Sequence, residues 1–197
     1  MPEKPFGIRK TDPGLVVSPR DNLPVAEIRH RGFARHYNPA VNNARIDKLD
    51  GQSSLPWRKM QRCLIPLSTW YEWSGPPGAK QTFAFQSQHR DELLWAAGLR
   101  ENGDSGPTYS MITREASPTL AFIHPRMLAL LEPAAFDAFL KAKIPAIFST
   151  LRSRICPSFD ASIPFIISPV IRGLRPWKCC PAFSGFIAAP TRSSAKC

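Results

Sequence analysis

The chain has 197 residues, 43% of them hydrophobic, which suits one soluble domain with a core of its own. No apolar run approaches the roughly 20 residues of a membrane span, and the start Met1–Pro5 lacks a signal peptide's apolar core, so we expect a cytoplasmic protein without membrane contact. Five cysteines without a Cys-x-x-Cys pair favour reduced thiols over disulfides or zinc, and we predict neither a metal nor an organic cofactor.

The net charge of +11 suggests a polyanionic partner, but it is unevenly distributed. Residues 1–140 hold 17 basic and 14 acidic residues, whereas residues 141–197 hold nine and one. The second part also carries four of the five cysteines and seven prolines. We therefore predict one domain over residues 1–140 and a poorly ordered basic tail over 141–197, in which Ile163–Ile171 is compatible with a short strand. One hypothesis is that this tail arose from a change of reading frame.

The first half of the chain reads as loop-rich β structure. Prolines interrupt the opening as far as residue 24, around a short strand at Leu15–Val17. The basic stretch Val25–Tyr37 either meets a nucleic-acid backbone or forms a solvated strand. Ser54 is placed near the N-cap of a helix that runs to about Met60.

The second half predicts paired strands followed by helices. Arg62–Pro66 is a buried strand, and the turn at Gly75–Gly78 predicts a hairpin over residues 63–86. Strands at residues 93–99 and 109–113 flank a turn, and short helices follow at residues 117–124 and 132–140. The chain is therefore predicted to be an α+β domain, mainly an antiparallel β-sheet or barrel with a few short helices.

Glu72 is the candidate for proton-transfer chemistry. It lies in the run Trp70-Tyr71-Glu72-Trp73, where aromatic neighbours would desolvate its carboxyl group, raise its pKa and suit it to general acid–base catalysis. An alternating strand places Trp70 and Glu72 on one face and Tyr71 and Trp73 on the other. The alternative is therefore that Glu72 is a solvated residue of an edge strand.

Other polar positions stand out in apolar surroundings, although each has an ordinary structural explanation. Asn43 and Arg45 follow Val41, and an Asn-x-Arg sequence is commonly a turn. Thr113 ends a strand, and His124 follows the predicted helix, where a histidine is often a capping or core residue.

Taken in order, the sequence blocks around these residues resemble the SOS-response-associated peptidase (SRAP) family of abasic-site-processing proteins. The resemblance covers residues 8–140 and includes five blocks. These are Asn43-Ala-Arg45, Arg62-Cys-Leu-Ile-Pro66 leading into Trp70–Trp73, Ala97-Gly-Leu99, Met111-Ile-Thr113-Arg-Glu-Ala116 and Ile123-His-Pro-Arg-Met127.

The resemblance implies an activity on DNA. In the family, self-cleavage after the initiator methionine unmasks a cysteine, whose amine and thiol form a thiazolidine crosslink with an abasic site in single-stranded DNA. By the same resemblance Asn43 would orient the nucleophile, Glu72 would shuttle protons and His124 would act on the ring-opening sugar oxygen. The DNA-binding residues would be Arg45 on phosphate, Thr113 in the pocket, Trp73 stacking on a base, and Arg126.

This sequence also departs from the family pattern. It reads Met1-Pro2-Glu3 where the family has Met-Cys-Gly-Arg, so we expect the family N-terminus to be missing and crosslinking to be lost. Arg31 stands for the first tryptophan of a Trp-Gly block, Pro125 for an acid and Leu128 for a proline.

Three hypotheses stay open for this chain. The first is a monomeric, nucleoid-associated abasic-site-processing protein whose partner is single-stranded DNA with abasic sites. The others are a non-catalytic single-stranded DNA binder and a non-functional truncated copy.

Overall fold

The structure of the chain is a computed structural model that describes residues 7–21, 23–49, 57, 59–89, 91–104, 106–141 and 165–169. Its strands are β1 (Pro13–Arg20), β2 (Leu23–Arg31), β3 (Phe33–Arg35), β4 (Asn38–Val41), β5 (Asn43–Arg45), β6 (Gln61–Leu67), β7 (Trp70–Ser74), β8 (Gln81–Ser87), β9 (Leu94–Gly103), β10 (Gly106–Glu115), β11 (Arg126–Leu128) and β12 (Phe165–Pro169). The helical segments are η1 (Ile46–Lys48), η3 (Pro133–Ala135) and α1 (Phe136–Lys141).

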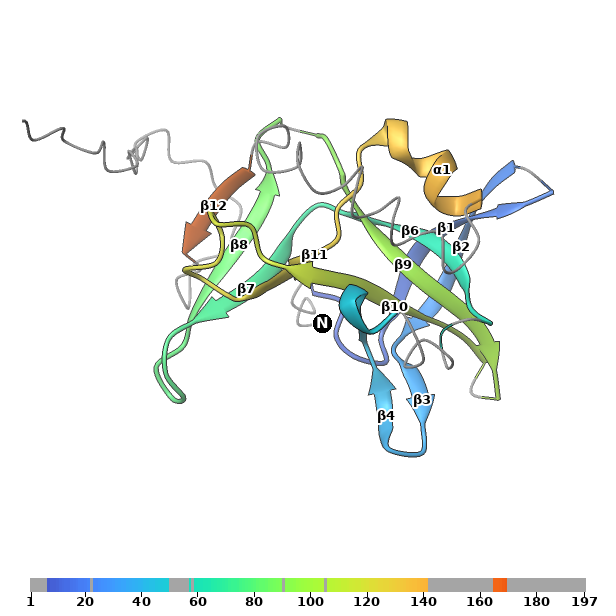
Figure 1. Cartoon of the computed structure of the whole chain (residues 1–197), viewed down its shortest axis with the longest axis horizontal. Coiled ribbons are helices and arrows are strands. Elements are labelled where there is room, and N and C mark those ends of the chain that lie inside the picture. Colours follow the sequence, from blue (N-terminus) through green and yellow to red (C-terminus); the bar gives the residue numbers. More distant parts are fainter. Residues whose placement is uncertain are drawn as a thin grey trace, which may run out of the picture.

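Five strands form a closed ring of backbone pairings, in the order β10, β2, β1, β6, β9 and back to β10 (Figure 1). The pairs β1–β2, β1–β6, β6–β9 and β9–β10 are antiparallel, while β10 meets β2 in parallel. Closure removes free strand edges, so the ring is a small barrel. This confirms the predicted fold class of a mainly antiparallel sheet with little helix.

Strand β10 organises the part of the barrel that carries three of the sequence blocks named above. Its second half pairs in parallel with β5, with Thr113 opposite Arg45, and in antiparallel with β11, with Thr113 opposite Leu128. Three short segments far apart in sequence, at residues 43–45, 111–115 and 126–128, are thereby held side by side.

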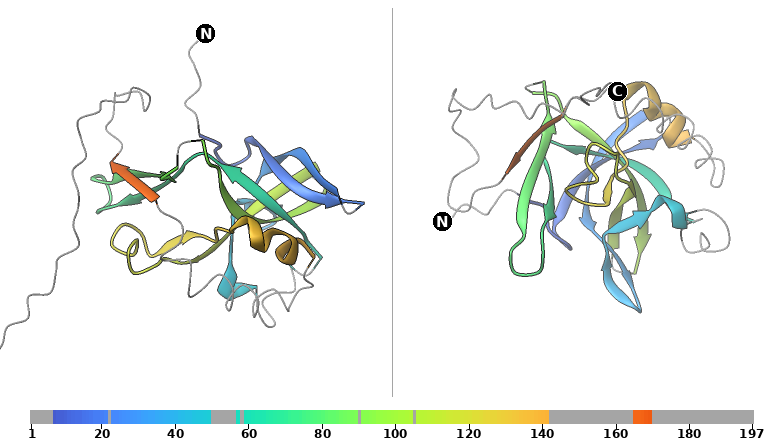
Figure 2. Two further views of the ribbon diagram at one scale, coloured as in Figure 1. Left: turned by 90° about the horizontal axis from the view of Figure 1, so that it is seen from above. Right: turned by 60° about the vertical axis from the view of Figure 1, so that its left-hand side comes forward.

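A second sheet of three strands, in the order β12, β8, β7, lies beside the barrel (Figure 2). Only Ser68 and Thr69 separate β6 of the barrel from β7 of this sheet. Among the described residues, β7 pairs with β8 alone, and its other edge lies toward the segment that leads into β11.

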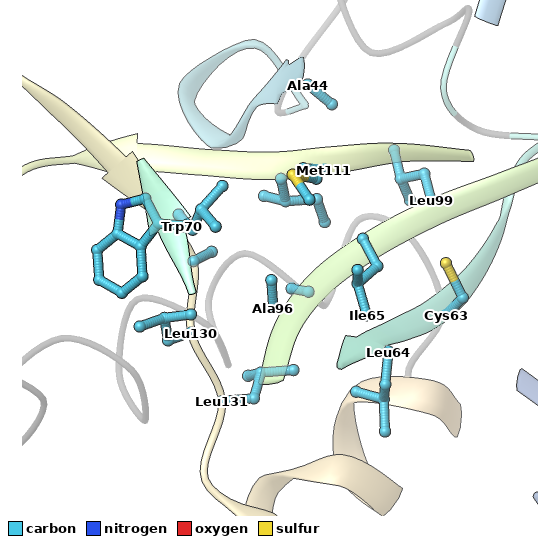
Figure 3. Close-up of a cluster of buried hydrophobic side chains, with 14 of the residues drawn as sticks. Ala44, Cys63, Leu64, Ile65, Trp70, Ala96, Leu99, Met111, Leu130 and Leu131 are labelled. Carbon is cyan, nitrogen blue, oxygen red and sulfur yellow. The ribbon is translucent and has the colours of Figure 1, made fainter. Parts of the chain in front are cut away.

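The hydrophobic core fills the barrel and extends under the second sheet (Figure 3). Residues Cys63–Ile65 of β6 are buried on both faces because the barrel lies on one side and α1 packs on the other. Trp70 continues this core into the second sheet, where its ring stacks on Phe85 with centroids 4.5 Å apart.

Gly98 of β9 is required by close packing. A Cβ atom there would lie 2.6 Å from Cδ1 of Ile65 and 2.9 Å from Sγ of Cys63, both in the core. Gly98→Ala should therefore cost about 1–3 kcal/mol in the free energy of unfolding, measured by denaturant titration. The matched control is Gly103→Ala at the end of the same strand, where the nearest atom would be 3.6 Å away. An equal loss in both variants would contradict this explanation.

Several predicted elements are confirmed. The buried strand at Arg62–Pro66 is β6, the strand pair at residues 93–99 and 109–113 is β9–β10, and the helix at residues 132–140 is η3 with α1. The turn at Gly75–Gly78 connects β7 to β8 and closes with a hydrogen bond from the amide of Ala79 to the carbonyl of Pro76.

Other predicted elements were wrong in extent or type. The hairpin consists of β7 and β8 only, because β6 pairs with β1 and β9 instead. The opening strand is not limited to Leu15–Val17 but spans Pro13–Arg20. Residues 117–124 form successive turns rather than a helix. The carbonyls of Ser117 and Leu120 accept the amide hydrogen bonds, and Pro125 disfavours a helical conformation at His124. Ser54 and Pro56 of the first predicted helix lie outside the described residues.

The predicted tail has one described element. Strand β12 lies within the segment Ile163–Ile171 and adds to the second sheet beside β8. The predicted boundary at residue 140 stays a prediction.

Much of the basic stretch Val25–Tyr37 is used inside the protein. The guanidinium of Arg29 is buried, with the residue only 2% exposed, and it donates to the carbonyl of Glu101 at 2.8 Å and to a carboxylate oxygen of Glu27 at 3.1 Å. Arg35 makes a two-pronged hydrogen bond to the carboxylate of Glu101 at 2.7 and 2.9 Å. Arg29 thus joins strands of the barrel and Arg35 joins β3 to β9, so both are already paired within the protein.

Candidate functional site

Strand β7 carries Glu72 into the space between the second sheet and the turns before β11. The alternation of the strand holds Trp70 and Glu72 on the inner face, as predicted, and the stacked ring of Trp70 fixes the strand's rotation. The Glu72 side chain is 17% exposed although β7 is an edge strand. Glu72 is therefore a half-buried carboxylate rather than a solvated edge residue.

His124 lies against Glu72. Its Nδ1 atom is 3.6 Å from Oε2 of Glu72, which is too long for a hydrogen bond but close enough for a strong electrostatic interaction. Nδ1 is also 2.9 Å from the carbonyl oxygen of Arg126. In the tautomer protonated at Nδ1, that N–H donates to this carbonyl, and Nε2 keeps a lone pair for a ligand. In the other tautomer, Nδ1 accepts the backbone N–H of Arg126 at 3.2 Å, and Nε2 carries the proton.

The surroundings of Glu72 alter its acidity. Burial raises the pKa of the Glu72 carboxyl group above its ordinary value, while the charges of His124 and Arg31 partly offset this effect. The net result is a raised pKa, which brings a carboxyl group closer to the pH at which it can both accept and release a proton.

An exposed aromatic ring borders this pair. Trp73 is 46% exposed, and its ring centroid lies 6.2 Å from that of His124. The Nζ atom of Lys80, in the loop before β8, lies 5.5 Å from the centroid of the Trp73 ring. A cation over an indole is a favourable arrangement and holds positive charge beside the site.

A charged cluster lies next to His124 along β11. Arg126 donates from Nη2 to the carbonyl oxygen of Thr113 at 2.8 Å, and its Nη1 is 3.1 Å from Oδ1 of Asp47. Arg45 binds the same carboxylate, with Nη2 2.7 Å from Oδ2. These two guanidinium groups share one acid, so the cluster keeps a net positive charge.

The two arginines differ in how far they can reach a ligand. The Arg45 side chain is 55% exposed, which leaves part of its guanidinium open to solvent. Arg126 is mostly buried, and its terminal nitrogens contact Thr113 and Asp47. Hydrogen bonding from Arg45 lowers the pKa of the Asp47 carboxyl group, so Asp47 remains charged and holds both arginines in place.

The sequence-predicted residues thus fall into two connected groups. Glu72, Trp73 and His124 form one group, while Arg45, Thr113 and Arg126 form the other, and the backbone of Arg126 joins them at His124. Asn43 shares a face of β5 with Arg45 and is exposed, but among the described contacts none links it to Glu72 or His124.

Three residues of the site were missed by sequence reasoning. Asp47 had a detectable signal, because an acid only two residues after Arg45 lies within reach of its guanidinium, here in the first turn of η1. Lys80 could have been placed near Trp73 from the predicted hairpin, because Trp73 pairs with Thr82, two residues after Lys80. Arg31 was noted only as a departure from the family's Trp-Gly block, and its effect on Glu72 was missed because it comes from a strand distant in the sequence.

The described part of the chain has no group of three or more His, Cys, Asp or Glu side chains placed to hold a metal ion. Among the same residues, no helix combines the length and apolar character needed to cross a membrane.

Comparison with known proteins identifies the family. The sequence model described as SOS response associated peptidase (SRAP) matches residues 28–157, about two thirds of the chain. This chain belongs to the SRAP family. The match runs from the second part of β2 through α1 and thus includes every residue of the two groups above.

Curated relatives of this SRAP chain carry a functional name. It is 31% identical over 105 residues to the abasic site processing protein YMR114C of Saccharomyces cerevisiae, covering 50% of this chain and 28% of that protein. It is 31% identical over 117 residues to the abasic site processing protein HMCES of Gallus gallus, covering 47% of this chain and 35% of that protein. The matched region therefore spans about a third of each relative.

Solved structures confirm the SRAP chain's fold. A protein of Bordetella bronchiseptica superposes with a TM-score of 0.64 at 21% identity, covering 87% of this chain and 90% of that one. A protein of Bacteroides thetaiotaomicron gives a TM-score of 0.61 at 17% identity, covering 82% and 75%. At these identities the likeness establishes the fold alone.

Proposed function

We propose that this SRAP protein recognises abasic sites in single-stranded DNA and that Glu72 and His124 transfer protons at the exposed deoxyribose. The observation that carries the proposal is the pairing of a half-buried carboxylate with an imidazole 3.6 Å away, beside an exposed tryptophan and a net-positive arginine cluster. An abasic nucleotide offers a sugar hydroxyl for the acid–base pair and a phosphate for Arg45. The neighbouring bases offer flat faces for Trp73.

The chemistry that suits this pair is the opening of the abasic sugar ring. The Glu72 carboxylate would accept the proton of the C1′ hydroxyl as the C1′ carbonyl forms. The C1′–O4′ bond would break, and protonated His124 would give its proton to O4′. The product is the open-chain aldehyde, with no net change in atoms, and the reverse step uses the same two groups in opposite roles.

The thiol of Cys63 is poorly placed to form a covalent crosslink with DNA. Cys63 is the one cysteine among the described residues, and it is fully buried in the barrel core. Burial raises the pKa of its thiol to about 12, so it is neither accessible nor ionised at neutral pH. We therefore infer that recognition takes place without a covalent bond to Cys63, and a denaturing gel after incubation with abasic DNA should show no adduct that Cys63→Ala removes.

The proposal is tested by equilibrium binding to three labelled DNAs of one sequence. The first is a single strand with one abasic site, the second is the same strand with an intact base, and the third is the abasic strand in a duplex. Tightest binding is expected for the first. Equal affinity for the abasic and intact single strands would overturn the proposal, whereas a uniform loss of affinity with added salt would reflect phosphate contacts alone.

A further inference from the structure

The outward face of β7 carries a second exposed aromatic residue that the mechanism above does not use. Tyr71 is 38% exposed and lies two residues before Trp73, so both side chains lie on the same face of the strand. Two residues along a strand are about 6.7 Å apart. Tyr71 and Trp73 therefore form a pair of aromatic rings spaced along one exposed strand.

The neighbouring strand leaves these rings uncovered. Across the sheet, Tyr71 pairs with Ala84 and Trp73 pairs with Thr82. Alanine and threonine are too small to bury an aromatic ring on that face, whereas the inner face of the same strands holds the stacked pair Trp70 and Phe85. The sheet thus has one aromatic face that is packed and one that is open.

The open face is continuous with the candidate site and carries a positive charge, which is complementary to the phosphates of a nucleic acid. The Trp73 ring approaches His124 with a centroid separation of 6.2 Å, and the ammonium of Lys80 lies 5.5 Å from the same indole. Aromatic side chains on a strand face, together with a nearby cation, are the means by which single-stranded nucleic acids are held, because bases stack on the rings and phosphates meet the charge.

Trp73 already has a stacking role from the family resemblance. We propose that Tyr71 extends this position into a base-stacking strip along the outer face of β7, on which the next base of the strand lies, with Lys80 contacting the phosphate backbone. The strip would fix the direction in which the strand leaves the site. This inference rests on the proposed function, since the strand on the strip is the one that presents its abasic sugar to Glu72 and His124.

The test is a set of binding measurements on the whole chain with fluorescent single strands that carry one abasic site. Tyr71→Ala is expected to weaken binding by about five-fold to 150-fold, the usual effect of losing one stacked base, while Tyr71→Phe keeps the ring and the affinity. The matched control is Ile28→Ala, which truncates an exposed side chain on β2, 61% exposed and outside the site.

A second set of DNAs separates stacking from a structural effect of the substitution. Each of the bases flanking the abasic site is removed in turn. On the strand that lacks the base held by Tyr71, Tyr71→Ala should bind as the wild type does. Lys80→Gln should instead reduce the slope of log affinity against log salt by about 0.7, as expected for one lost phosphate contact on a single strand.

The outcomes distinguish this inference from the function on which it rests. If the wild type fails to bind single-stranded abasic DNA, both are overturned. If the wild type binds with the expected preference but Tyr71→Ala binds each DNA as tightly as the wild type does, the proposed function stands and the stacking strip is wrong. A loss on Tyr71→Ala that is the same for all DNAs also contradicts the strip, because stacking depends on the base.

Discussion

Glu72→Gln should slow the opening of the abasic sugar ring on the protein by about 10²–10⁴-fold, the usual contribution of a positioned acid or base. The amide keeps the size of the side chain but cannot accept the C1′ proton. The rate can be followed as exchange of the C1′ oxygen with labelled water, because the open aldehyde hydrates reversibly and exchange requires ring opening. Affinity for abasic DNA should change far less than the rate.

The control for this experiment is another carboxylate-to-amide change, Asp137→Asn. Asp137 lies on α1 and pairs with Lys141 at the surface, away from the site. Its variant should exchange oxygen at the wild-type rate. If Glu72→Gln exchanged as fast as Asp137→Asn, Glu72 would have no part in proton transfer.

The same variant has a predictable effect on stability. Burial raises the pKa of the Glu72 carboxyl group because the folded protein accommodates its neutral form better than its charged form. Ionisation of Glu72 therefore lowers the free energy of unfolding as pH rises above about 4.5, the pKa of the group in the unfolded chain. Glu72→Gln should therefore be at least as stable as the wild type at pH 8. A slower ring opening by this variant would then reflect the missing carboxylate and not unfolding.

Glu27→Gln should have the largest effect on stability, about 3–5 kcal/mol, because it leaves buried guanidinium groups without their acid. Oε1 of Glu27 lies 2.9 Å from Nε of Arg29, although too far off the N–H direction for a hydrogen bond, and 3.3 Å from Nη1 of Arg100. Oε2 accepts a hydrogen bond from Arg29 at 3.1 Å, and Oε1 accepts one from Ser18 at 2.9 Å. This cluster joins β1, β2 and β9 inside the barrel.

The pH dependence gives this prediction a second test. The hydrogen bond from Arg29 lowers the pKa of the Glu27 carboxyl group below its ordinary 4.5. A lowered pKa in the folded state contributes stability that is present above the unfolded value and is lost as pH falls through the folded one. Urea titrations should therefore show the full difference between wild type and Glu27→Gln at pH 7, and a smaller one below about pH 4.

Exposed ion pairs provide the contrast. Asp137→Asn removes the surface pair with Lys141, whose two side chains are 76% and 66% exposed, and should alter stability by less than about 1 kcal/mol. Equal losses in Glu27→Gln and Asp137→Asn would mean that the Glu27 cluster is not a buried network.

The sequence predicted the β-rich class and the face on which Glu72 lies, because strand alternation and turn residues are local signals. It did not predict that the barrel closes through β10, since pairings such as Thr113 with Arg45 join distant segments. It also missed the turns at residues 117–124, where Pro125 disfavours a helix that local propensity favours.

For the candidate site, the structure shows positions and the roles stay predictions. Glu72, His124 and Trp73 lie together, and the raised pKa of Glu72 follows from its burial. The positive stretch around Arg29 was harder to interpret. A charge count cannot tell a solvated arginine from one paired inside a barrel with Glu27.

The most direct test of the account is an NMR titration of the protein with carbon-13 in its glutamate carboxyl groups, using Glu72→Gln to assign the Glu72 signal. We predict that Glu72 titrates above its ordinary value of 4.5, and that its signal shifts when a single strand with an abasic site binds but not when the intact strand binds. A Glu72 that titrates at its ordinary value and responds equally to both strands would contradict the account.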